Sequence, residues 1–167
     1  MHTVDILRYG HQHVMEMIEQ VPDDAWEEPG VAGNWSAKDV IGHLGAFELM
    51  LGEVLASVEA GAPTAGLQEW ISTDPEEMNT RQAALRAHLP ARAVIEEYVH
   101  AHDHAMELAR RVPADRFSAG GVIPWYGDEY DLDDFLVYTF YGHKREHLAQ
   151  IGAHLDVRSR TTAAARR

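Results

Sequence analysis

Apolar residues recur at spacings of three and four along four long stretches of this chain, at about residues 4–21, 37–59, 91–112 and 131–155. No stretch shows the sustained alternation of apolar and polar residues that is typical of a half-buried strand. A spacing of three and four places the apolar side chains on one face of an α-helix, which must be buried against another element. The sequence therefore predicts an all-α protein that folds as a four-helix bundle.

Residues that begin or interrupt helices mark the connections between these stretches. Ser36, followed by Asp39, has the pattern of a capping box at the start of the second helix. Residues 61–90 form a long crossover, in which Asp74 followed by Pro75 predicts the start of a short helix. A crossover of this length allows the second and third helices to run in the same direction, so that the second and fourth helices are antiparallel.

Length and composition favour one domain and exclude several kinds of partner. A chain of 167 residues fits a single domain, expected over residues 1–157, followed by an Ala/Arg/Thr-rich tail at 158–167 that we expect to fray. The formal net charge of -13 argues against a nucleic-acid partner, because binding to a phosphate backbone normally needs a basic surface. The absence of cysteine excludes disulfides, thiolate metal ligands and a cysteine nucleophile.

Charged residues within the most apolar stretch indicate whether the chain can cross a membrane. Residues 40–58 contain His43, Glu48 and Glu53, which argues against a membrane span, and the N-terminus lacks the pattern of a signal peptide. We therefore expect a cytoplasmic protein with no membrane partner.

Three histidines have the spacing of metal ligands. His143 and His147 are four residues apart on the apolar face of the fourth helix, where two imidazoles can bind one ion. His43 lies on the apolar face of the second helix, and antiparallel packing would bring it to a similar depth. Three such ligands would leave coordination positions open, as catalytic metal sites do. The alternative is that these histidines are ordinary hydrogen-bonded core residues.

Two segments carry a resemblance to a known family. Residues 35–44 (WSAKDVIGHL) and 142–151 (GHKREHLAQI) resemble the start of the second helix and the C-terminal histidine motif of the DinB-like superfamily, which includes YfiT-like metal-binding four-helix bundles. The resemblance implies a long crossover after the second helix and a divalent metal, zinc or nickel, bound by His43, His143 and His147. It also implies a homodimer.

Different branches of this superfamily imply different functions. One branch contains bacillithiol- and mycothiol-dependent transferases, in which a metal activates a low-molecular-weight thiol, and the complete histidine triad favours it. The DfsB/ClbS branch is associated with self-protection against genotoxins. Trp70, residues 77–79 (EMN) and residues 124–127 (PWYG) are similar to that second branch.

These observations lead to two functional hypotheses. The first is a metal-dependent thiol S-transferase or hydrolase that activates a thiol cosubstrate, or water, for attack on a small electrophile. The alternative is a non-catalytic metal- or ligand-binding protein of stress resistance or self-resistance. A di-iron bundle is disfavoured, because only Glu97–His100 fits the Glu-x-x-His motif that such sites need twice.

Further residues are expected to surround the metal. His11, on the inward face of the first helix, is a candidate partner of the ligands or a proton carrier, although it is equally ordinary as a core histidine. The expected substrate-binding residues for a small molecule are Trp70, Asn79, Trp125 and Tyr126, in or near the loops, where binding groups are common.

Overall fold

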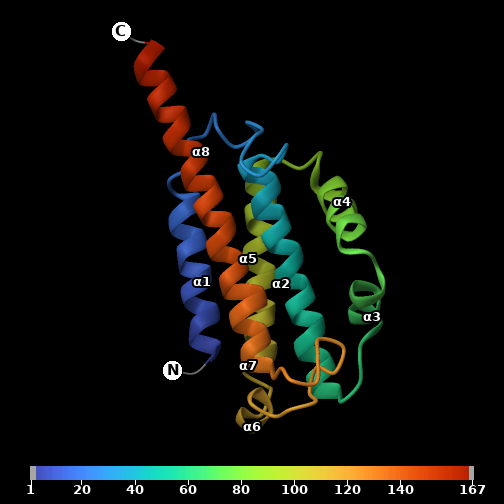
Figure 1. The fold of residues 1–167 in the computed structure, drawn as a ribbon. Helices are drawn as coiled ribbons and strands as arrows, with labels where there is room; N and C mark the ends of the chain where they lie inside the picture. Colours follow the sequence, from blue (N-terminus) through green and yellow to red (C-terminus); the bar gives the residue numbers. More distant parts are fainter. Residues whose placement is uncertain (1–2, 166–167) are drawn as a thin grey trace.

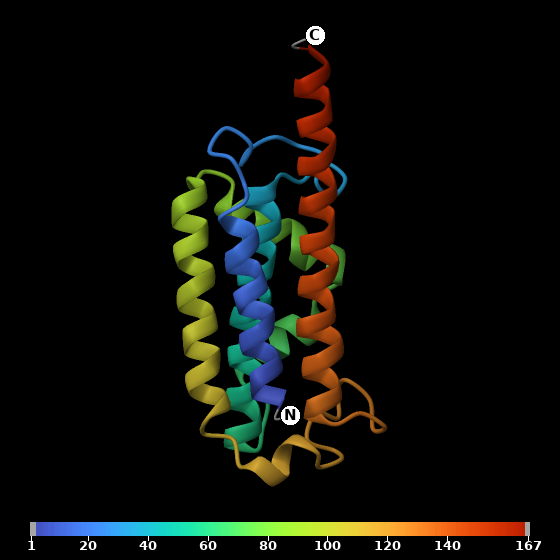
Figure 2. The same ribbon diagram turned by 90° about the vertical axis from the view of Figure 1, so that its left-hand side faces the viewer.

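Four long helices form the body of the molecule (Figure 1). The structure is a computed structural model that describes residues 3–165. The long helices are α1 (Thr3–Ile18), α2 (Ala37–Ala60), α5 (Ala91–Ala109) and α8 (His143–Ala165). α1 and α8 run in one direction and α2 and α5 in the other, so that α2 and α8 are antiparallel (Figures 1 and 2). The described residues contain no strand, and the predicted all-α four-helix bundle is confirmed.

The crossover between α2 and α5 contains two helices that pack against α2. These are α3 (Ala65–Ser72) and α4 (Pro75–Arg86), which lie along one side of the bundle (Figure 1). α4 begins where the sequence predicted, and the side chain of Asp74 accepts hydrogen bonds from the first backbone N–H groups of the helix. α3 was not predicted, because its few apolar residues are too short a run to show a period.

The start of α2 has the predicted capping box. The Ser36 side chain accepts a hydrogen bond from the backbone N–H of Asp39, and the Asp39 carboxylate accepts one from the backbone N–H of Ser36. At the other end, Gly61 has φ 72°, a left-handed conformation that glycine adopts without strain and that commonly ends a helix. Both ends of α2 are therefore specified locally.

The C-terminal part of the chain differs from the single helix predicted over residues 131–155. It forms the short helix α7 (Leu132–Phe135), a π-helix η1 (Leu136–Gly142) and then α8. A π-helical turn holds about one residue more than an α-helical turn. Each residue after it is therefore rotated about the helix axis from the position it would have in an uninterrupted α-helix. The short helix α6 (Ala114–Phe117) lies in the loop between α5 and α7.

α8 also continues past the expected end near Leu155. It is helical to Ala165 and projects beyond the bundle (Figure 2). The segment 158–167, expected to be a frayed tail, is thus a continuation of α8 as far as Ala165, and residues 166–167 lie outside the described part of the chain. Arg158 ties the beginning of this extension to Asp24 and Glu28.

The apolar core has two parts that share α2. One surrounds the C-terminal half of α2, with Leu51 and Leu55 in contact with residues from α5, α7 and η1. The other surrounds its N-terminal half, with Val40 and Leu44 packed among residues of α1, α5 and α8. By length and composition α2 is apolar enough to cross a membrane, but 72% of its most apolar part is buried inside the bundle, as is usual for a core helix.

The capping box at α2 gives a stability prediction. Replacing Ser36 by alanine should lower the free energy of unfolding by about 1 kcal/mol, because the backbone N–H of Asp39 loses its side-chain acceptor. Urea unfolding followed by circular dichroism measures the change. Ser72→Ala is the control, since the exposed Ser72 hydroxyl bonds only a carbonyl within α3, and an equal loss in both variants would contradict the capping role.

Candidate metal centre

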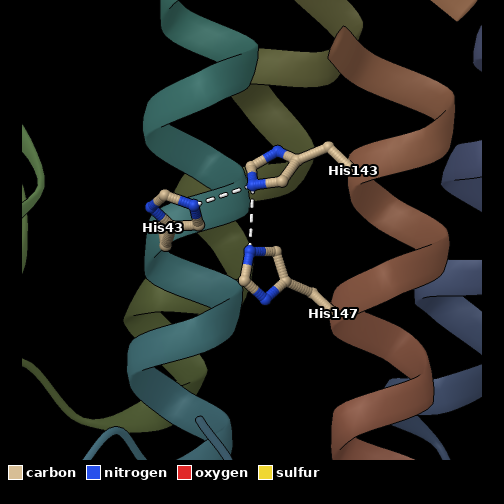
Figure 3. Close-up of side chains that lie close together, drawn as sticks. All are labelled: His43, His143 and His147. Carbon is tan, nitrogen blue, oxygen red and sulfur yellow. Dashed lines mark hydrogen bonds between the residues drawn. The ribbon is translucent and has the colours of Figure 1, made fainter. Parts of the chain in front are cut away.

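Three histidine side chains from two antiparallel helices meet between those helices. His43 lies in the second turn of α2, whereas His143 and His147 lie on successive turns at the start of α8. Their rings point toward one another across the gap between α2 and α8 (Figure 3). The sequence predicted this grouping, and these are the residues that the structure brings together.

The ε-nitrogens of the three rings converge closely. Nε2 of His143 is 3.0 Å from Nε2 of His43 and 2.9 Å from Nε2 of His147. The three ligand nitrogens all lie within 4.8 Å of one another. Nitrogens that each bind one ion at about 2.0–2.1 Å are separated from each other by roughly 3 Å. The residues present therefore fit a divalent metal without rearrangement of the backbone.

Burial keeps two of these imidazoles neutral. It lowers the pKa of His43 to about 3, with the neighbouring His143 and His147 contributing in the same direction. It also lowers the pKa of His143 to about 4, assisted by His147 and by the positive charge of Lys144. Only a neutral imidazole offers a lone pair to a metal, so both rings are in the binding form at neutral pH.

Contacts around the triad hold the rings in place. Nδ1 of His147 is 2.8 Å from Oε1 of Gln150, which can accept a hydrogen bond from Nδ1–H and so leave Nε2 available as the ligand nitrogen. Phe47 lies against both His43 and His143, at ring-centroid distances of 4.8 and 4.3 Å, and Trp35 lies 5.0 Å from His43. Helical spacing could have identified Phe47 and Gln150, which are four and three residues from a ligand. Trp35 precedes α2, and no spacing in the sequence pointed to it.

The expected substrate-binding residues lie at different distances from the triad. Trp70 of α3 is half-buried and packs against Phe47, with ring centroids 5.8 Å apart, so it is one side chain removed from the ligands. Asn79 is half-buried on α4. Trp125 and Tyr126 pack against Phe135 at the end of the bundle.

His11 belongs to a different group of side chains. Its ring is stacked on that of His102, with centroids 4.0 Å apart, and its Nδ1 is 3.2 Å from the Tyr98 hydroxyl. Burial, followed by the charges of His102 and Lys144, lowers the pKa of His11 to about 4. These contacts place His11 between α1 and α5, with His102 as its partner.

Fold and site together define a class of protein, a four-helix bundle in which two antiparallel helices supply three histidines that can hold a divalent metal. The family model described as the DinB superfamily matches residues 7–151, a range that includes all three histidines, and the chain belongs to this superfamily. No curated protein and no solved structure matches the chain significantly. The family resemblance seen in the two sequence segments is thus confirmed.

The lowered pKa of His43 predicts a pH dependence of stability in the metal-free protein. Because the pKa is about 3 in the folded state and near 6.5 in an unfolded chain, the unfolded state binds the extra proton first as the pH falls. Stability should therefore decrease from about pH 6.5 downward. His43→Gln should reduce the loss between pH 7 and pH 5 by on the order of 1 kcal/mol.

Urea unfolding at both pH values measures this difference. His100→Gln is the matched control, because His100 is exposed on α5 and lies outside the triad. A loss of stability that is the same in His43→Gln and in the wild type would show that His43 titrates as it does in an unfolded chain.

Proposed function

We propose that this protein is a metal-dependent enzyme that activates a low-molecular-weight thiol, or water, for attack on a small electrophile. The convergence of three imidazole nitrogens from α2 and α8 is the observation that carries the proposal. His43 is buried, whereas His143 and His147 are half-buried, so the group has a side that faces solvent. A set of three protein ligands with room for another ligand is typical of catalytic zinc sites rather than structural ones.

The three imidazoles fit zinc or nickel, the ions that the family resemblance implies. Imidazole nitrogen suits both, whereas magnesium and calcium prefer oxygen ligands. A divalent metal at such a site, when bound, lowers the pKa of a coordinated thiol or water so that the nucleophile is present near neutral pH.

The chain's own residues determine which nucleophile can be used and where an electrophile can bind. Because the sequence has no cysteine, a reactive thiol has to be a cosubstrate. Burial keeps His43 and His143 neutral, and Gln150 orients His147. Phe47 and Trp70 give one side of the site an aromatic surface, which suits an apolar electrophile. Among the expected substrate-binding residues, Trp70 has the position that best supports this role.

The metal site itself is tested by stoichiometry. Protein purified without a histidine tag should contain about one divalent metal per chain, measured by elemental analysis. His147→Ala removes one of the three ligands and should lower both the metal content and the affinity for added Zn²⁺, by at least tenfold. The control is His100→Ala, which removes an exposed histidine outside the triad. Full occupancy and wild-type affinity in His147→Ala would refute the assignment of ligands.

The proposed reaction is tested with a panel of thiols and the electrophile monochlorobimane, which becomes fluorescent on capture by a thiol. The metal-loaded wild-type protein should accelerate capture of at least one thiol, and His43→Ala should not, because its metal site is incomplete. Equal rates for the two proteins, at matched concentrations of protein and metal, would contradict thiol activation and favour the non-catalytic metal- or ligand-binding function over a thiol transferase.

A further inference from the structure

A fully buried ion pair lies in the core between the two helices that carry the histidines. Glu48 of α2 is 0% exposed and Lys144 of α8 is 2% exposed, and the ammonium contacts Oε1 of the carboxylate. The other carboxylate oxygen, Oε2, is 3.1 Å from Nδ1 of His102 on α5. Burial disfavours a charged Glu48, but Lys144 and His102 outweigh it and lower its pKa to about 2. The Glu48 carboxylate is therefore ionised at neutral pH.

Stability is a poor explanation for such a pair. Removing two charges from water costs as much as their attraction returns, and apolar residues of similar volume are often as stable or more so. A buried pair does, however, oppose other arrangements of its helices, because each of them would leave a charge buried without a partner. Here, if α8 slid by one helical turn, Leu148 would take the place of Lys144 opposite Glu48. The buried carboxylate would then have lost the lysine charge with which it is paired.

The surroundings of Lys144 leave its side chain little freedom. On α1, a Cβ added to Gly10 would lie 3.2 Å from Cδ of Lys144, so the absence of a side chain at Gly10 makes room for the lysine. On α5, the Tyr98 ring lies 5.9 Å from the ammonium. Lys144 is thus enclosed by α1, α2 and α5, and its charge is paired with Glu48.

The pair lies next to the histidine triad in both helices. Lys144 directly follows His143, and Glu48 follows His43 by five residues. The π-helix η1 ends at Gly142, immediately before His143, so the rotational phase of α8 is not a simple continuation of α7. The Glu48–Lys144 contact at the start of α8 can set that phase together with the apolar contacts of Leu148 and Ile151.

We propose that Glu48 and Lys144 are positioning residues for the metal centre. Their ion pair fixes the rotation and the height of α8 against α2, so that His143 and His147 face His43 before a metal binds. The inference rests on the proposed metal site, because it assigns the pair a role in the affinity of that site.

The test is the double substitution Glu48→Gln/Lys144→Met. It removes the two charges at nearly constant volume, and the glutamine carbonyl can still accept a hydrogen bond from His102. The double substitution Glu28→Gln/Arg158→Met is the control, since it removes an ion pair that also holds α8 but lies near its far end. Both proteins are compared with the wild type by urea unfolding without metal and by titration with Co²⁺, whose visible absorption reports ligand geometry.

The Glu48→Gln/Lys144→Met protein should remain folded without metal and unfold cooperatively in urea. It should bind Co²⁺ at least tenfold more weakly, with an altered visible spectrum, while the control binds as the wild type does. Wild-type affinity and spectrum in this variant would overturn the positioning role but would not contradict the assignment of the metal ligands. Failure of the variant to fold would also overturn it, because the pair would then act through stability. Failure of the wild type to bind Co²⁺ would remove the metal site and the positioning role together.

Discussion

The polar side chains buried on α2 constrain how the other helices can be arranged around it. α2 is packed against α5, α8 and the crossover helices, so a polar group on its inner faces has lost water and needs a protein partner. His43 meets two histidines of α8, and Glu48 meets Lys144 of α8 and His102 of α5. Apolar packing tolerates exchanges of similar shape, whereas these contacts are directional. The position of α8 is therefore specified by polar groups as well as by the core.

The sequence predicted those parts of the fold and site that depend on short-range spacing. The four long helices, the capping box at Ser36 and the start of α4 at Asp74 each depend on residues within a few positions of one another. The pairing of His143 with His147 depends on a spacing of four on one helix. His43 could be predicted as the third ligand because the long crossover allows α2 and α8 to be antiparallel. The family resemblance supports the same prediction.

Features that depend on three-dimensional enclosure could not be predicted in the same way. Glu48 and Lys144 are charged residues, which usually lie on the solvent-exposed face of a helix. Only the packing of α1, α2 and α5 around them shows that they are buried. The inward placement of His11 was expected, but its stacking on His102 depends on the rotation of α1 against α5. The π-helix at Leu136–Gly142 was not predicted, because the apolar residues there have the spacing of an ordinary α-helix.

That π-helix has a consequence for how the chain can vary in length. An α-helix advances by about 100° per residue, so deletion of one residue between Asp131 and His143 would be absorbed most simply by conversion of η1 into regular α-helix. The helix would remain continuous and its amino acids would be almost unchanged. A one-residue gap in this segment of a related sequence is therefore compatible with an unchanged histidine face, because loss of the wider π-helical turn compensates for the missing residue.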